Sequence, residues 1–495
     1  MKKFTILLVA ASICMQLCAC QANPSSAVVV SKNDGSFNKN LSKTAPSGEN
    51  DYENIQYIDN FFSTDRSIEY TLDIDQALNV STMPVVEIVP HKFLTEDVKR
   101  VANVLFDEGT FYEREPSKNP NFSKMQIQKA IARWSKYTNS PSMKRLIMDS
   151  SEENIADQID LLQDYITQYT EKLDNAPVEN SYIPCEWTFR KDSHYNNLEA
   201  EIGGSLLVDE PDVIYSTVEM NDIEYIFTAS THNTAAYKLN TIDVTLSSGI
   251  GPAEMDMMIY RAMLCRVPQP SEEQILSISS KAQNMLDTMQ LGDWIVTDSY
   301  VETRDFEGIS EHVIVVEATP AFFGISAIYG QKTPSATAAD IYAAFYPISR
   351  AEFGFSPNGE LIYFRMQSPI DIKKVVNSNV ETIPLDEMME NAKNYLILRD
   401  AHTGYGIPSD MIYLYEDVMN EALSCKIEIN KLNVGLARID VANSESYYYV
   451  PAIAFSGNAN YYGKDTGNLY LCSTDYKDGN INLLWLNAVD GSIIS

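Results

Sequence analysis

The cysteine at position 20 is the residue whose surroundings most clearly indicate a chemical reaction. Lys2 and Lys3 precede an apolar run, Phe4–Ile13, and the segment closes with Leu17-Cys18-Ala19-Cys20. This order of charge, apolar run and small residue is typical of a secretory signal, and its ending has the form of a lipobox. We therefore expect cleavage before Cys20 and a diacylglyceryl thioether on its sulfur.

Two other interpretations compete for this segment. An uncleaved membrane span would need about 20 apolar residues, but the run is shorter and Gln16 interrupts it. An ordinary signal cut elsewhere would leave the cysteines near the cut without a role. Because two acyl chains form a stable anchor, the lipobox predicts a protein held on the extracytoplasmic face of the cell membrane through Cys20.

Four further cysteines fall in the part of the chain that is expected to fold. Their wide spacing matches no zinc or iron–sulfur pattern; they are Cys185, Cys265, Cys425 and Cys472. Outside the cytosol four cysteines allow three disulfide pairings, and buried free thiols are the alternative. The sequence leaves both open.

No other residues form a recognisable reactive group. The sequence contains no H-E-x-x-H, G-x-S-x-G or P-loop motif. The five histidines are scattered, and we expect each to be a surface or hydrogen-bonded structural residue; they are His91, His194, His232, His312 and His402. We therefore predict no catalytic residue, no metal and no cofactor.

The charge balance excludes two classes of partner. The 495 residues include 37 basic and 68 acidic side chains, which gives a net charge of −31. Such a surface repels nucleic acid and anionic lipid headgroups, so we expect neither as a partner. A hydrophobic content of 45% and 29 tyrosines indicate a folded chain with room for two or three domains.

Composition and periodicity predict an α+β fold, with an N-terminal helical and β region followed by two helix-plus-antiparallel-sheet modules. Residues 1–19 are the predicted lipoprotein signal and 20–67 a lipidated flexible tether, since they are rich in Ser, Asn and Lys. An N-terminal α+β domain is expected over 68–267. The two modules follow at 268–380 and 381–495.

Capping signals mark the predicted helix starts. Capping boxes open at Ser123, Ser150 and Ser271. Thr95 is the expected N-cap of another helix, and Pro384 the first residue of a fifth. The helix after Ser150 carries an apolar stripe, which we interpret as a core-packing face rather than a coiled coil; it consists of Ile155, Ile159, Leu162, Ile166, Tyr169 and Leu173.

Turn signals predict two hairpins, at Pro357-Asn358-Gly359 and at Asp478-Gly479. Each hairpin ends a region in which one helix precedes four strands, so the two modules are predicted to be a tandem repeat. Near the start of the second module's strands, the apolar alternation shifts by one residue between Ile429 and Leu432. That shift predicts a β-bulge.

Two stretches resemble known families. The segment Asp73–Phe106 (DIDQALNVSTMPVVEIVPHKFLTEDVKRVANVLF), after the start CQANPSSAVVVSKNDGS, resembles an uncharacterised family of Gram-positive lipoproteins with a domain of unknown function. The stretch Tyr447–Ser495 is similar to PepSY-like domains and to the YycH/YycI-type extracytoplasmic regulators, although those regulators are anchored by a transmembrane helix. The resemblance implies helix-plus-sheet domains that act by contacting other proteins.

Three classes of function follow from the sequence. The leading one is a non-enzymatic, surface-tethered protein with an interaction or regulatory role and an extracytoplasmic protein partner. The first alternative is a lipoprotein that binds a small ligand or a glycan. Exposed tryptophans would support it, but several of the four (Trp134, Trp187, Trp294 and Trp485) lie on predicted core faces. The second is an extracellular hydrolase that uses a pair of carboxylates, since the 68 acids of the chain supply many candidates.

Overall fold

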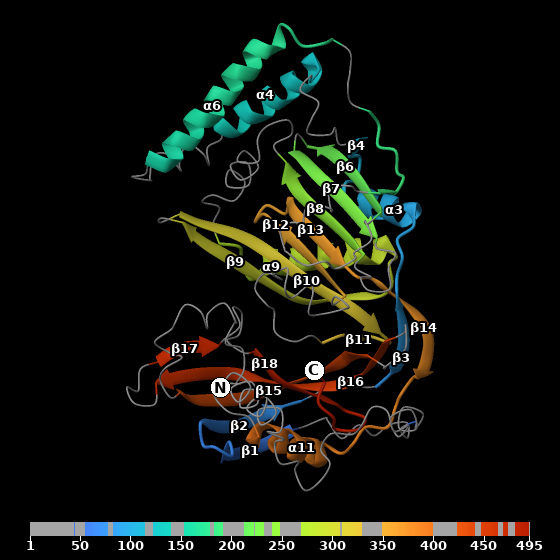
Figure 1. Cartoon of the computed structure of the whole chain (residues 1–495), viewed down its shortest axis with the longest axis vertical. Coiled ribbons are helices and arrows are strands. Elements are labelled where there is room, and N and C mark those ends of the chain that lie inside the picture. The colour runs from blue at the N-terminus through green and yellow to red at the C-terminus, as the bar shows by residue number, and fades with distance from the viewer. Residues whose placement is uncertain are drawn as a thin grey trace, which may run out of the picture. The chain divides into compact units, whose positions relative to one another are not determined.

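Figure 1 shows the chain in a computed structural model. The structure describes residues 44, 55–77, 83–113, 122–139, 153–178, 183–191, 212–221, 223–231, 240–247, 269–306, 309–328, 349–398, 423–440, 447–463, 469–473 and 481–494. The lipobox at Cys20 and the turn at Asp478-Gly479 lie outside these residues. Of the described helices, none is long and apolar enough to cross a membrane.

The predicted α+β class is wrong, because the chain is mainly β. Among the described residues, strands account for about twice as many as helices, and they form two large sheets. The prediction gave each helix a small sheet of its own. In the structure, strands from distant parts of the chain join the same sheet, so sheet dominates.

The chain divides into two compact units, and one is inserted into the other in sequence. The central unit comprises residues 87–374, and the split unit comprises 1–86 and 375–495. The boundaries fall within strands β3 (Val85–Pro90) and β14 (Ile370–Asn377). This division differs from the predicted serial one, since residues 68–267 contribute to both units, as do residues 268–380.

The central unit is built on a ten-stranded sheet. Its path runs β11-β10-β12-β13-β8-β7-β6-β4, with β9 beside β10 and β5 beside β6. The strands are β4 (Thr110–Glu113), β5 (Arg190–Lys191), β6 (Asp212–Met220), β7 (Ile223–Thr231), β8 (Thr241–Ser247), β9 (Trp294–Phe306), β10 (Ile309–Phe322), β11 (Ile325–Ser326), β12 (Arg350–Phe355) and β13 (Leu361–Gln367). All pairings given for this sheet are antiparallel.

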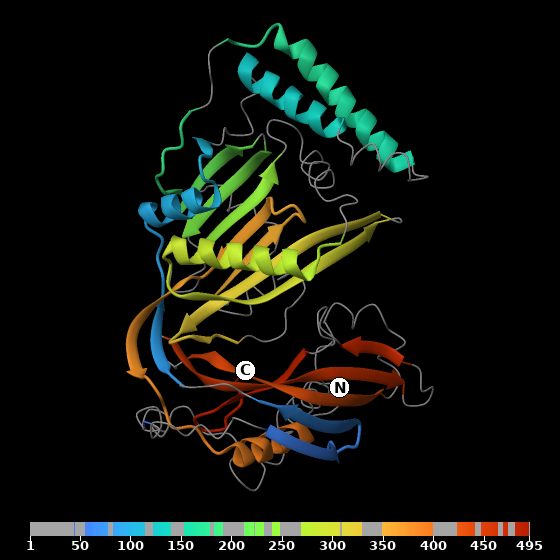
Figure 2. The ribbon, with the colours of Figure 1, turned by 180° about the vertical axis from the view of Figure 1, so that it is seen from behind.

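Two helices, α3 (Thr95–Leu105) and α9 (Glu272–Met289), lie on one face of this sheet (Figure 2). Their apolar sides join the same core as the buried side chains of β7, β8, β12 and β13. Two more helices, α4 (Lys124–Thr138) and α6 (Glu153–Leu173), pack against each other. The predicted core-packing role of the α6 stripe is confirmed, since Ile159 and Leu162 are buried and Tyr169 meets the Trp134 ring edge to face at 5.2 Å.

The helix starts follow local sequence closely. Both described capping boxes are confirmed. The Ser123 hydroxyl accepts a hydrogen bond from the backbone N–H of Gln126, and the Ser271 hydroxyl accepts one from the backbone N–H of Gln274. The expected N-cap at Thr95 is wrong by one residue. Leu94 holds that position, because the Asp97 carboxylate accepts its backbone N–H at 2.9 Å and so supplies the cap from inside the helix.

The split unit has an eight-stranded sheet with the path β1-β2-β15-β16-β3-β14, and with β17 and β18 also paired to β16. Its remaining elements are β1 (Ile55–Phe62), β2 (Ile68–Gln76), α11 (Leu385–Ile397), β15 (Leu423–Asp440), β16 (Tyr447–Gly463), β17 (Leu469–Ser473) and β18 (Ile481–Asn487). β2 and β15 pair in parallel, with Ile68 opposite Cys425. Pro384 is the N-cap of α11 rather than its first residue.

Strand β1 corrects the predicted tether. Ile55 and Phe61 are buried, and all eight residues of β1 pair with β2. The flexible segment 20–67 was therefore predicted too long, at least from Ile55 onward. Its polar average composition concealed a short alternating strand, which is stabilised only by the sheet that it joins.

The strand predictions gave mixed outcomes. The bulge is confirmed, because the β15–β16 register shifts between Ile429 and Lys431. The hairpin at Pro357-Asn358-Gly359 joins β12 to β13, and Gly359 has the positive φ of 81° that favours glycine. The tandem repeat of one strand order is not observed: β13 pairs with β12 and β8, whereas β18 pairs with β16.

Candidate functional site

A groove lies between α3 and α9 in the described part of the central unit and has a volume of about 940 Å³. Both helices are amphipathic, so burying one face against the sheet leaves their polar faces side by side. Val104 and Met285 contribute apolar surface to the groove, and both are half-buried. The polar lining residues are Glu96, Lys99, Arg100, Asn103, Asp107, Ser277, Ser280, Lys281, Asn284 and Thr288.

Arg100 joins the two helices at one end of the groove. Its Nε donates to the Met289 carbonyl at 2.6 Å, and its Nη2 donates to Asp97 Oδ1, also at 2.6 Å. A cation at the C-terminus of α9 satisfies carbonyl groups that lack helical partners and opposes the helix dipole. Arg100 is therefore held in place before any ligand arrives.

Lys281 contributes a second cation from α9. Its Nζ donates to the Gly359 carbonyl at 2.9 Å and lies 5.1 Å from the centre of the Phe355 ring. Burial lowers the pKa of Lys281 below the ordinary value of lysine. With Lys99, whose side chain is exposed on α3, the groove presents three cations.

The two acidic residues of the groove do not form a catalytic pair. Glu96 lies in the first turn of α3 and Asp107 lies beyond its end. At about 1.5 Å per residue this places them roughly 16 Å apart along the helix axis, well beyond the ~5–9.5 Å that separates the two carboxylates of glycoside hydrolases. The carboxylate-dependent hydrolase receives no support from this groove.

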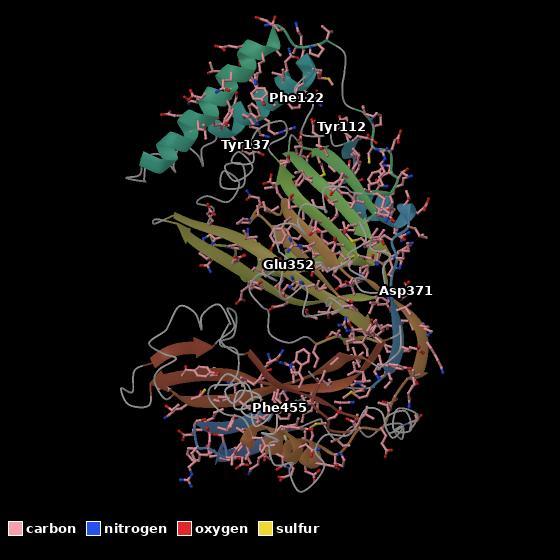
Figure 3. The ribbon with its side chains drawn as sticks, viewed as in Figure 1. Tyr112, Phe122, Tyr137, Glu352, Asp371 and Phe455 are labelled. Carbon is pink, nitrogen blue, oxygen red and sulfur yellow. The ribbon has the colours of Figure 1, made fainter. Side chains whose placement is uncertain are left out.

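A row of charged residues crosses the other face of the same sheet. Cross-strand pairing places Asp298, Glu317, Glu352, Arg365 and Asp243 on five strands in succession. Arg365 Nε donates to Asp243 Oδ1 at 2.7 Å, and the Tyr300 hydroxyl donates to Glu317 Oε1 at 3.4 Å. Glu352 is labelled in Figure 3. Opposed carboxylates such as Glu317 and Glu352 repel each other. The Tyr300 hydroxyl, which donates to Glu317, and Arg365, which lies opposite Glu352, offset this repulsion.

The tyrosines in this row act as partners of the carboxylates. Burial and the adjacent Glu352 raise the pKa of Tyr363, so its hydroxyl stays protonated and can donate. Tyr363 also packs over Gly354, where a Cβ would collide with its ring. The row lies outside the α3–α9 groove and outside the smaller hollow beside Trp294, and we assign it a structural role.

The two described histidines are both hydrogen-bonded, as predicted. His312 is buried, with Nδ1 lying 3.0 Å from the Thr303 hydroxyl. His91 lies between two carboxylates, with Nδ1 2.9 Å from Asp371 Oδ1 and Nε2 3.3 Å from Asp97 Oδ2. The predictions for His194, His232 and His402 fall outside the described residues.

Two of the four cysteines have described side chains. Cys185 and Cys425 are free thiols, and burial raises the pKa of Cys425 to about 12, which makes it unreactive. Cys265 lies outside the described residues, and the side chain of Cys472 is not described. Where the structure is described, no group of three His, Cys, Asp or Glu side chains could bind a metal ion.

Exposed tryptophan platforms would support the glycan-binding alternative, and none of the described tryptophans is fully exposed. Trp134 and Trp294 are buried, and Trp187 packs against the central core. Trp485 is half-buried in β18. A sugar ring stacks on an open aromatic face, which the two buried tryptophans do not offer, whereas Trp187 and Trp485 are each partly exposed.

Sequence reasoning missed the groove, although both helices were predicted. The only sequence signal for the groove was a basic residue on the exposed face of each helix, Lys99 on α3 and Lys281 on α9, in a chain that is acidic overall. Their proximity depends on the sheet that both helices cover, and no local pattern reveals it. Searches against protein-family models, curated proteins and solved structures gave no match.

Proposed function

We propose that this protein is a lipid-anchored, non-enzymatic binding protein that holds an acidic segment of another extracytoplasmic protein in the groove between α3 and α9. The observation that carries the proposal is the sign of the groove's charge. Its lining has the three cations Lys99, Arg100 and Lys281 against two carboxylates. The whole chain, by contrast, has 37 basic and 68 acidic residues.

Charge of this kind favours one class of partner. A locally basic groove attracts an acidic segment, while the acidic remainder of the protein surface repels it. The charge pattern therefore selects acidic partners and directs them to the groove. The fixed Arg100 requires little ordering on binding, and that lowers the entropic cost of association. Lys99, at the exposed rim, mainly affects the rate of encounter.

The shape of the groove suits a helical occupant. Two packed helices leave a furrow into which a third amphipathic helix can lay its apolar side, in the helix-in-groove mode of peptide recognition. Val104 and Met285 supply the apolar contact, and methionine adapts its shape to different side chains. The acidic positions of the occupant then face the cations.

The test uses two synthetic helical peptides with the same apolar stripe, one with glutamate and one with lysine at the polar positions. We expect the glutamate peptide to bind more tightly, by fluorescence anisotropy, and its binding to weaken with added salt. In Lys99→Glu protein its affinity should fall about tenfold, or ~1.4 kcal/mol. The control is Lys172→Glu, which reverses an exposed charge on α6 outside the groove.

Three results would contradict the groove assignment. They are equal affinity for the two peptides, equal loss in the Lys99→Glu and Lys172→Glu proteins, and binding that survives both reversals. Hydrolysis of a peptide or a glycan by the purified protein would contradict the non-enzymatic part of the proposal. Each outcome is read on the full chain, with circular dichroism confirming that the variants are folded.

The lipid anchor has a separate test. Replacing Cys20 by serine removes the sulfur that would carry the diacylglyceryl group, so we expect the variant to remain uncleaved at this site and to lose its mature, lipid-modified form. Mass spectrometry of the N-terminus and membrane fractionation measure this. Cys18→Ser, two residues earlier, should be processed normally, and identical processing of the Cys20→Ser variant and the wild type would refute the lipobox.

A further inference from the structure

His91 lies where the chain has just entered the central unit, one residue after the end of β3. Asp371, its partner, belongs to β14, by which the chain leaves that unit. The His91 amide donates to the Pro369 carbonyl at 2.8 Å, and Asn240 Nδ2 donates to the His91 carbonyl. The backbone of His91 is therefore fixed, and the imidazole connects the incoming segment to the outgoing strand.

The imidazole has a carboxylate at each nitrogen. Nδ1 lies 2.9 Å from Asp371 Oδ1 and 3.1 Å from Oδ2, and Nε2 lies 3.3 Å from Asp97 Oδ2. A neutral imidazole has one N–H, so it can donate to one of these groups and must turn a lone pair towards the other. The imidazolium donates to both. The geometry thus fits the protonated form and conflicts with the neutral one.

The two carboxylates differ in what else holds them. Asp97, on α3, also accepts from Arg100 Nη2 at 2.6 Å and from the Leu94 amide at 2.9 Å, and it is largely buried. Asp371, which is labelled in Figure 3, has a side chain that is more than half exposed. When His91 loses its proton, Asp97 keeps its remaining donors, whereas Asp371 can turn to water. Deprotonation of His91 therefore breaks the His91–Asp371 contact, which links the segment after β3 to β14.

We propose that His91, Asp97 and Asp371 form an acid-strengthened clamp across the two segments by which the chain enters and leaves the central unit, closed when His91 is protonated and loosened at alkaline pH. The clamp does not depend on the proposed binding function. It adds a pH response to a junction that a second ion pair also bridges: Lys373 Nζ of β14 lies 2.8 Å from Glu87 Oε1 of β3.

The sign of the effect follows from the charges around the ring. The hydrogen bond to Asp371 raises the pKa of His91 above its ordinary value, burial opposes this, and the charges of Asp371 and Asp97 add to it. Arg100 is the cation that faces Asp97, with which it forms an ion pair. Because the pKa of His91 is higher in the folded protein, the clamp stabilises fully at pH values below the pKa of histidine in the unfolded chain, about 6.5. This stabilisation is lost as the pH rises through the pKa of His91 in the folded protein.

The test is a titration of His91 in the full chain, followed by the NMR signal of its Cε1 proton. We expect a pKa above the ordinary ~6.5 in the wild type. Asp371→Asn should lower it by about one unit, because it removes the charge and leaves the exposed site intact. Lys373→Gln, which breaks the neighbouring ion pair across the same strands, should leave it almost unchanged.

Hydrogen exchange supplies the structural readout. Corrected for the intrinsic rate, protection of the backbone around residues 85–91 and 370–377 should decrease in the wild type between about pH 6 and about pH 9, and should not in His91→Gln. A wild-type pKa at or below the ordinary value, or the same pH dependence in the wild type and His91→Gln, would overturn the clamp. Should His91→Gln fail to fold, Asp371→Asn decides the question.

Discussion

Replacing Gly457 with alanine should destabilise the split unit by about 3 kcal/mol or more. A Cβ at this position would lie deep inside the van der Waals radius of the Glu428 carbonyl oxygen, which belongs to the backbone of the neighbouring strand. The collision cannot be relieved by turning a side chain. Relief requires the two central strands of the sheet, β15 and β16, to move apart.

The cause of the close approach is the bulge in β15. The register slips between Ile429 and Lys431, and Gly457 is the partner of Ile429 immediately before the slip. An extra residue kinks the bulged strand and brings its backbone towards the partner. Glycine has no Cβ, so it permits this approach, and a larger residue would force the bulge out of place.

Urea denaturation followed through the fluorescence of Trp485, which lies in β18 of the same sheet, measures the loss. The matched control is Asn458→Ala, the next residue of β16, whose side chain donates to Glu428 Oε2 at 3.3 Å. That change should cost about 1 kcal/mol or less, because it removes a hydrogen bond and inserts no atom. Equal midpoints for the two variants would show that the backbone is not in close contact at the bulge.

A second large effect is expected at Arg133, which joins α4 to the sheet of the central unit. Its Nη1 lies 2.9 Å from Glu224 Oε2, and its Nη2 lies 3.8 Å from Glu219 Oε2. Arg133 and Glu224 are both buried, whereas Glu219 is partly exposed and also pairs with Lys129 at 3.1 Å. Arg133→Met should therefore destabilise the central unit by about 3 kcal/mol, since it leaves the charge of Glu224 buried without this partner.

The double variant Arg133→Met, Glu224→Met separates charge from packing. Removing both buried charges should restore most of the lost stability, because two apolar side chains of similar length fill the space. The single variant should also recover as the pH falls, since the buried Glu224 carboxyl, no longer opposite Arg133, can then take up a proton. Trp134 fluorescence during denaturation measures both. Equal stability of the single and double variants would contradict this account.

Local signals in the sequence were sufficient for most helices and turns. The Ser123 and Ser271 capping boxes, the Gly359 hairpin and the Ile429 bulge depend on residues within a few positions of one another, and each lies where the pattern placed it. Prediction failed where a strand's partner is distant. Ile68 and Cys425 pair in parallel although most of the chain separates them, and no periodicity encodes that choice.

The candidate sites follow the same division. That His91 would be hydrogen-bonded was predictable from residue type alone, but its two partners were not. Asp97 is close in sequence, whereas Asp371 is reached only because β3 and β14 are neighbours in one sheet. The groove likewise needs α3 and α9 on a common sheet face. Sequence patterns identify which residues are polar and exposed, and tertiary pairing decides which of them meet.

The insertion of one unit into another has a consequence for the order in which the chain can fold. Chains are made from the N-terminus, and whole domains fold as they are completed. Strands β1 and β2 are made first, yet the parallel neighbour of β2 is β15, which begins at Leu423. The central unit is complete at residue 374, so it can fold before β15 has been made to pair with β2. Until the last strands arrive, β2 presents an open edge that a chaperone or a second chain could occupy, so a truncated product is expected to aggregate through β2 even with its central unit intact.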